Sequence, residues 1–228
     1  MVDYIGVIKK PFRDLQTLLI GIIIGLIPVL NLLVIGYAVG AARSVLKGKD
    51  ALPKWDPENA AQYIKDLVIA TVIFFIYLIP ALIINVVAGG VAIGGIYSGF
   101  ISGRVVEATL AVLAGGLIAL VALLFGVAGI LLAAMAIMFY VKTGSITEAF
   151  NFVAILKKVP TPAYTGAVLA MIVYSVIITI IATIISGIVA IVPIVGWVVA
   201  PFLFMGIVFF ILETTAQLLV AQVFKETP

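Results

Sequence analysis

The chain contains no cysteine and no histidine among its 228 residues. Without cysteine it forms no disulfide bond and offers no thiolate as a nucleophile or metal ligand. Without histidine it lacks the side chain that most often serves as a general base or an imidazole ligand. These two absences exclude most known types of catalytic site and zinc site. We therefore expect a protein that is not an enzyme and that has no metal and no cofactor.

Charged residues are also scarce, at 10% of the sequence, whereas roughly 25% is typical of soluble domains. Hydrophobic residues make up 65%, and the mean hydropathy is +1.38. A soluble fold of this size could not bury so much apolar surface, so lipid must cover the outside. The apolar runs are continuous, unlike the alternating strands of a membrane β-barrel. The sequence therefore predicts an all-α, polytopic transmembrane helical bundle that forms a single domain over 1–228.

The positions of the thirteen Lys and Arg residues predict how the chain is oriented. Basic residues flank the ends of several apolar runs, and the positive-inside rule places such ends in the cytoplasm. We expect a multi-pass plasma-membrane protein with both termini cytoplasmic, in contact with membrane lipids and not with nucleic acid. Residues 1–14 are mixed in character and show no cleavage site, so we expect an interfacial anchor there and not a signal peptide.

Residues 15–46 form an apolar run that is too long for one upright crossing. As one helix, about 32 residues would extend roughly 48 Å, well over the ~30 Å hydrocarbon core. Pro28 interrupts the run, and basic residues precede and follow it. We predict a hairpin that turns near Pro28 and Asn31, with a single kinked helix as the alternative.

The remainder of the chain is predicted to contain four long crossings. Within it, Pro80 is expected to kink the first crossing, and Pro193 with Gly196 is expected to form the last turn. Asp56 is expected to cap a helix start, and Ser145 with Glu148 matches a capping box. The predicted segments are a cytoplasmic loop at 47–66, a crossing at 67–88, an outer glycine-rich loop at 89–104, a crossing at 105–141, a cytoplasmic amphipathic helix at 142–162, and a C-terminal hairpin of two crossings at 163–192 and 195–224.

Glu213 is the strongest candidate for a functional residue. It lies in the last crossing about 12 residues, or roughly 18 Å, before Lys225. A carboxylate at that depth must be protonated, paired or hydrated. Thr214 and Gln217 add polar groups to the same helix. Two roles remain open: a polar path for an ion, proton or substrate, or pairing between helices with Arg43 as the partner.

Other polar and small residues are expected to serve the structure. Asn31 is predicted to cap backbone groups freed at the first turn, with contact to a ligand in the polar path as the alternative. The spacing of Arg104 and Glu107 predicts a surface ion pair. Two Gly-x-x-x-Gly pairs predict close helix packing, within the chain or, alternatively, in a homodimer; they are Gly21 with Gly25 and Gly36 with Gly40.

Several short motifs, in the same order along the chain, resemble those of a known family. They are Gly36-Tyr37 followed by Arg43, Leu52-Pro53-x-Trp55-Asp56, Tyr140-Val-Lys142-x-Gly144-Ser145, Tyr164, and Ile191-Val-Pro193-Ile-Val-Gly196. The chain resembles the archaeal membrane proteins grouped as domain of unknown function 4013. It is more loosely similar to the membrane domain beside some bacterial glycerophosphodiester phosphodiesterases. The resemblance implies a helical membrane fold and an archaeal plasma membrane, but no activity.

Two functions from different classes remain open. The first is a small permease or channel-like protein for a small solute or ion, which works through the helix breaks at Pro28 and Pro193. The alternative is a membrane-organising scaffold without transport activity, whose amphipathic segments near 57–66 and 146–158 bind lipid headgroups or a partner. Either protein could act as a homo-oligomer or beside a partner membrane subunit.

Overall fold

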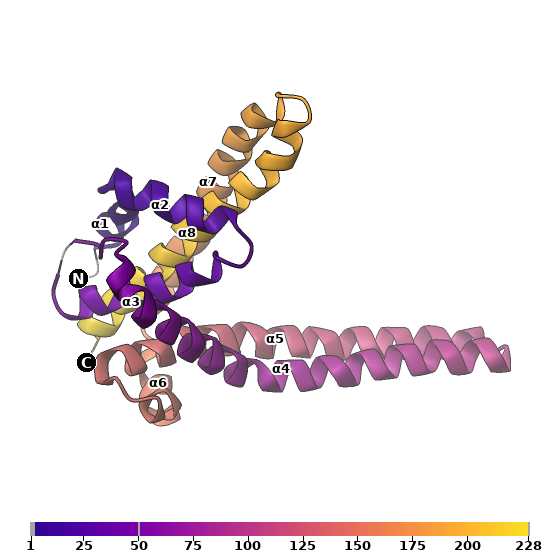
Figure 1. Ribbon diagram of the computed structural model, residues 1–228. Helices are drawn as coiled ribbons and strands as arrows, with labels where there is room; N and C mark the ends of the chain where they lie inside the picture. The colour runs from indigo at the N-terminus through magenta and orange to yellow at the C-terminus, as the bar shows by residue number, and fades with distance from the viewer. Residues whose placement is uncertain (1–2, 50, 228) are drawn as a thin grey trace. The chain divides into compact units, whose positions relative to one another are not determined.

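The computed structural model describes residues 3–49 and 51–227, and every regular element in these ranges is a helix (Figure 1). Four helices contain segments long and apolar enough to cross a membrane. The chain is therefore an all-α polytopic membrane protein, as its composition predicted. The four helices are α4 (Ala60–Ser102), α5 (Val105–Thr143), α7 (Pro162–Ala190) and α8 (Val195–Glu226).

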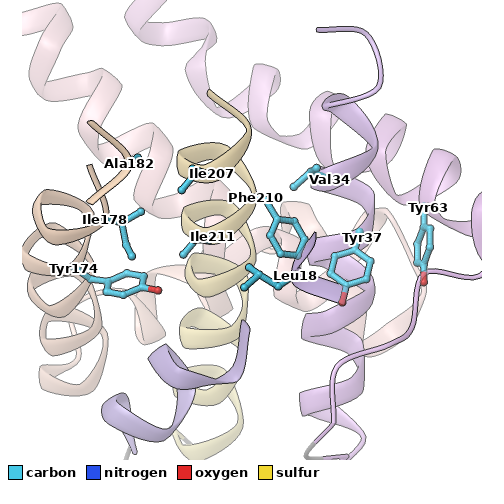
Figure 2. Packing of buried hydrophobic residues seen from close by; sticks show 10 residues of the cluster. All are labelled: Leu18, Val34, Tyr37, Tyr63, Tyr174, Ile178, Ala182, Ile207, Phe210 and Ile211. Carbon is cyan, nitrogen blue, oxygen red and sulfur yellow. The ribbon is translucent and has the colours of Figure 1, made fainter. Parts of the chain in front are cut away.

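The chain divides into two compact units. The first, which we call the bundle unit, comprises residues 1–71 and 134–228, and the second, the hairpin unit, comprises residues 72–133. In the bundle unit, α8 lies at the centre and packs against α2 (Leu15–Leu26), α3 (Leu32–Leu46) and α7. Figure 2 shows the resulting core, in which α8 contributes Ile207, Phe210 and Ile211 between residues of α7 on one side and of α2 and α3 on the other.

The N-terminal apolar run folds as a hairpin, and the alternative of one kinked helix is wrong. Asp14 caps α2 by accepting hydrogen bonds from the backbone N–H groups of Gln16 and Thr17, at 3.0 and 3.2 Å. The helix ends at Leu26 because the residue before a proline disfavours the helical conformation. At about 18 and 22 Å, α2 and α3 are both shorter than the hydrocarbon core, so neither spans it alone.

Small residues let these short helices approach their neighbours closely. A Cβ atom added to Gly25 would lie 3.0 Å from the backbone of Gly206 in α8. One added to Gly36 would lie within bonding distance of the carbonyl oxygen of Tyr63 in α4, so only glycine fits at that contact. Both glycine pairs thus serve packing within the chain, as the first of the two alternatives predicted.

The last two crossings form the predicted hairpin around Pro193. The turn covers residues 191–194, between the end of α7 at Ala190 and the start of α8. A Cβ atom at Gly196 would clash with the carbonyl oxygen of Val189, so the first turn of α8 passes directly against the last turn of α7. Pro193 and Gly196 therefore have the structural roles that the sequence predicted.

The hairpin unit corrects the predicted outer loop at 89–104. Helix α4 continues through Pro80 and through the glycine-rich stretch to Ser102, and the reversal is confined to Gly103 and Arg104 (Figure 1). Gly103 has φ 68°, which suits glycine best. The glycines upstream of it in this stretch are all helical, and two of them, Gly95 and Gly99, lie directly against α5. A Cβ atom at Gly95 would overlap the Cβ atom of Ala111.

The segment between α5 and α7 corrects a second local prediction. Ser145 does not cap a helix, since its hydroxyl lies 2.6 Å from that of Thr147 within an irregular turn. The chain instead forms a short 3₁₀ turn, Thr147–Phe150, and then α6 (Phe152–Lys158). Asn151 caps α6 by accepting from the N–H of Ala154 at 3.2 Å, because asparagine is as good a capping residue as serine. Asp56 behaves as predicted and accepts from the N–H of Glu58 at 3.0 Å.

Candidate functional site

A buried ion pair joins α3 to α4 in the bundle unit. The guanidinium of Arg43 donates two hydrogen bonds to the carboxylate of Asp66, at 2.6 and 2.8 Å. The Asp66 side chain is 0% exposed and that of Arg43 is 24% exposed. A carboxylate so deeply buried needs a charged partner in this two-point geometry, because desolvation alone would strongly disfavour its charge.

Two further side chains complete the hydrogen bonding of Asp66. The hydroxyl of Tyr140 in α5 donates to Asp66 Oδ1 at 2.8 Å, and the amide of Gln62 donates to the same oxygen at 2.9 Å. Both carboxylate oxygens are thus occupied by donors from three helices. Oδ1 accepts from Arg43, Gln62 and Tyr140, and Oδ2 accepts from Arg43. Such a network fixes the positions of the helices that contribute to it.

The predicted pairing of Arg43 with Glu213 is therefore wrong, since Arg43 binds Asp66. Asp66 was predicted to end the cytoplasmic loop at 47–66. In the structure, α4 begins at Ala60, so Asp66 lies within this helix. The spacing of Gln62 and Asp66, one helical turn apart, is the signal in the sequence that could have revealed this role.

The loop before α4 folds back onto α3 through aromatic rings. Trp55 stacks on Tyr37 with ring centroids 4.2 Å apart and an interplanar angle of 13°. The Tyr37 hydroxyl donates to the carbonyl oxygen of Pro53 at 2.8 Å, and that of Tyr63 donates to the carbonyl oxygen of Lys54 at 3.2 Å. Trp55 therefore packs the loop before α4 against α3.

The polar stretch of α8 lies in a helix that is otherwise apolar enough to cross a membrane. Glu213 is partly exposed and accepts from the amide of Gln217 at 3.1 Å. Thr214 is 0% exposed and Gln217 is 8% exposed. Within the part of the chain that the structure describes, Thr214 Oγ1 and Gln217 Oε1 are buried without a hydrogen-bond partner. The neighbouring Thr215 is also 0% exposed, and its Oγ1, like the hydroxyl of Tyr174 in α7, has no hydrogen-bond partner among the described residues.

The other predicted polar residues are dispersed. Asn31 is buried at the start of α3, but its side chain makes no capping hydrogen bond, because its own backbone is already helical at φ −59° and ψ −26°. Asn85 donates to the carbonyl oxygen of Ala81 at 3.0 Å. Arg104 and Glu107 form the predicted exposed pair at 3.1 Å.

Two lysine-lined cavities lie where several helices of the bundle unit end. The larger has a volume of about 350 Å³ and the smaller about 230 Å³, and Lys225 lines both. Lys158 lies at the end of α6, outside the four spanning helices, and both its burial and the charge of Lys142 lower its pKa. Besides Lys225, the larger cavity is lined by Lys142, Lys158, Leu46, Phe224 and Thr227. The smaller cavity is lined by Lys225 with Lys10, Val45, Gly48, Lys49, Gln222 and Glu226.

The arrangement limits the chemistry that is available. No group of three or more acidic, histidine or cysteine side chains able to hold a metal ion occurs among residues 3–49 and 51–227. The features able to meet a ligand are therefore the polar stretch of α8 and the two lysine-lined cavities. The sequence predicted the polar stretch through Glu213. It did not predict the two cavities, because their lining residues are far apart in the chain.

Comparison with known proteins agrees with the resemblance drawn from the motifs. No curated protein and no solved structure matches the chain. The looser similarity to the membrane domain beside glycerophosphodiester phosphodiesterases is therefore not shown. The family described as "Protein of unknown function (DUF4013)" matches residues 19–191, a range that ends just before the turn at Pro193. Because this match covers most of the chain, the protein belongs to the DUF4013 family.

Proposed function

We propose that this protein moves a small solute or ion across the membrane, with the polar stretch of α8 in the path. The observation that carries the proposal is the buried pair of Thr214 Oγ1 and Gln217 Oε1, which lack partners among the described residues of a membrane-crossing helix. Such atoms call for an explanation, and water, an ion or a substrate supplies one. Glu213 on the same helix adds the ionisable group expected in a proton or ion path.

The short helices α2 and α3 support the same proposal. Neither is long enough to span the hydrocarbon core, so the turn between them lies at membrane depth if their outer ends lie at one surface. Transporters use broken helices of this kind to place backbone groups near a substrate. The close contact of Gly25 with Gly206 places the end of α2 directly against α8, two turns before the polar stretch.

Flux measurements in proteoliposomes test this function. The protein is reconstituted with a pH-sensitive dye inside, and proton, Na⁺ and K⁺ fluxes are recorded for the wild type, for Glu213→Gln and for Glu107→Gln. We expect wild-type flux above that of empty liposomes, a loss of about tenfold or more for Glu213→Gln, and less than a twofold change for the exposed control Glu107→Gln. Equal fluxes for the two variants, or wild-type flux no greater than that of empty liposomes, would overturn the proposal.

The second candidate is the membrane-organising scaffold without transport activity. The lysine-lined cavities favour it, because basic groups at the ends of membrane helices attract anionic lipid. In this case the liposomes would show no flux, while the protein would bind anionic vesicles in a salt-sensitive way.

We also propose that both termini face the cytoplasm of a cell whose plasma membrane contains the protein. Among the cavity lysines, Lys10 lies near the N-terminus and Lys225 near the C-terminus, in keeping with the positive-inside rule. The absence of native cysteine allows a direct test with single cysteines. A membrane-impermeant maleimide applied to whole cells should label Ser102→Cys and leave Thr227→Cys unlabelled, and the reverse pattern would contradict this orientation.

A further inference from the structure

The two lysine-lined cavities carry an excess of positive charge with little opposing charge. The larger cavity contains Lys142, Lys158 and Lys225. The smaller contains Lys225 with Lys10 and Lys49, and Glu226 is the acidic residue among its described lining. Gathering like charges around a cavity is unfavourable unless a ligand of opposite charge is bound there. The arrangement is therefore typical of an anion site.

Two of these lysines are held in place by the same aromatic ring. The ammonium groups of Lys158 and Lys142 lie 4.7 and 5.5 Å from the centroid of the Phe224 ring. Lys158 also donates to the backbone carbonyl oxygen of Thr227, which fixes it against the end of α8. The two charges are thus positioned beforehand, so a bound anion would need to order fewer flexible groups. Burial and, to a lesser extent, the charge of Lys142 lower the pKa of Lys158, and a bound anion would offset both effects.

The surroundings of the cavities indicate what the anion is attached to. Lys142 and Lys225 lie in the last turns of α5 and α8, two helices with membrane-spanning segments. Helix α6, which ends at Lys158, exposes large apolar side chains of Phe152, Val153 and Leu156. Such a face suits the boundary between headgroups and acyl chains. A ligand in the larger cavity would contact lysine ammonium groups and, beside them, the exposed apolar side chains of α6.

From this geometry we propose that the two cavities bind the phosphate-bearing headgroup of an anionic membrane lipid. Lysine ammonium groups bind phosphate as compact point charges. The Lys158 ammonium already donates to the carbonyl oxygens of Phe224 and Thr227 and to the Thr227 hydroxyl, so it contributes charge while Lys142 and Lys225 supply the donors. The phosphate would lie among Lys142, Lys158 and Lys225, and the acyl chains would extend along the apolar face of α6. This site does not depend on transport, and it supplies the second candidate function with a ligand.

Lipid titration of the purified full chain tests the site. The protein in a mild detergent is titrated with phosphatidylglycerol or with phosphatidylcholine, and the apparent Kd is read from native mass spectra. The variant Lys142→Gln/Lys225→Gln removes two cavity lysines and leaves Lys158 on Thr227. The control Lys54→Gln/Lys157→Gln removes the same charge from two exposed positions outside both cavities.

We expect phosphatidylglycerol to bind the wild type more tightly than phosphatidylcholine does. The cavity variant should weaken phosphatidylglycerol binding by about tenfold or more, at roughly fivefold per lysine. The control should change it less than twofold, and Lys142→Arg/Lys225→Arg should retain it. An arginine variant that binds normally shows that charge, and not loss of folding, explains the glutamine variant.

Three results would overturn the proposal. Equal weakening by the cavity variant and the control would assign the binding to net charge alone. Unchanged binding by the cavity variant would place the lipid elsewhere. Displacement of phosphatidylglycerol by inorganic phosphate or glycerol 3-phosphate at matched concentrations would assign the cavities to a soluble phosphate compound. The result of the flux assay bears on none of these outcomes.

Discussion

The bundle unit and the hairpin unit are held together by different interactions. In the bundle unit, Arg43, Asp66 and Tyr140 form a buried network, and stacked aromatic rings fix the loop before α4. In the hairpin unit, α4 and α5 meet through glycine and alanine contacts, such as Gly95 with Ala111. Its ion pair, Arg104 with Glu107, is 66% and 58% exposed. Close glycine contacts thus occur in both units, whereas the buried ion-pair network lies in the bundle unit.

This difference indicates where function is expected. Helices in lipid gain no hydrophobic driving force from one another, so a plain hairpin is stabilised by small residues that allow close approach. Buried polar groups add a desolvation cost that packing alone does not require. The bundle unit contains these buried polar groups. It also contains the candidate sites, which are the polar stretch of α8 and both lysine-lined cavities.

The largest effect on stability is expected from Asp66→Asn. This variant leaves the partly buried guanidinium of Arg43 without its carboxylate. We expect a loss of about 3 kcal/mol in the free energy of unfolding, at the low end of values for a broken buried pair because Arg43 retains some exposure. Thermal unfolding in a mild detergent, followed by tryptophan fluorescence, measures the loss.

The double variant Arg43→Gln/Asp66→Asn separates the pair from its surroundings. If the two side chains interact as described, the double variant should be less destabilised than the sum of the two single variants. Additive losses would contradict the pairing and weaken the comparison between the two units.

A smaller loss is expected from Gly36→Ala. The added methyl group would meet the carbonyl oxygen of Tyr63, which belongs to the backbone and cannot rotate away. Overpacking of this kind typically costs about 1–3 kcal/mol. The matched control is Gly40→Ala, one turn later, whose nearest neighbour is the ring of Tyr63 at 3.2 Å. A loss for Gly40→Ala as large as that for Gly36→Ala would contradict the close approach of α3 and α4.

The sequence predicted the turns at Pro28 and Pro193 because each proline lies in an apolar run too long for one crossing, and proline disfavours the helical conformation of the residue before it. It did not predict that α4 continues to Ser102, because glycine weakens helices in water but favours close packing of helices in lipid. It also did not predict the role of Asp66, whose partners Arg43 and Tyr140 lie 23 and 74 residues away. Glu213 was identified from its position in an apolar run, whereas the cavity lysines converge only in three dimensions.

Within the hairpin unit, Gly94→Ala is expected to increase stability. Gly94 is helical, and a Cβ atom added to it would meet nothing within 4 Å. Replacing a helical glycine by alanine at an open position gains up to about 1 kcal/mol. The contrast is with Gly95→Ala in the same helix, which should lose stability because the added Cβ atom would overlap that of Ala111. A loss of thermal stability for Gly94→Ala would show that α4 requires glycine at this position.

The smallest effect is expected from Arg104→Gln, which removes the ion pair of the hairpin unit. Both partners are more than half exposed, and exposed pairs contribute about 0–1 kcal/mol. Added salt screens such pairs, so the small difference from the wild type should disappear near 1 M NaCl. The same salt should leave most of the loss in Asp66→Asn, because a buried pair is screened far less. A salt-insensitive loss above about 2 kcal/mol for Arg104→Gln would mean that this pair is buried in the membrane-embedded protein. A buried ion pair would then not distinguish the bundle unit from the hairpin unit.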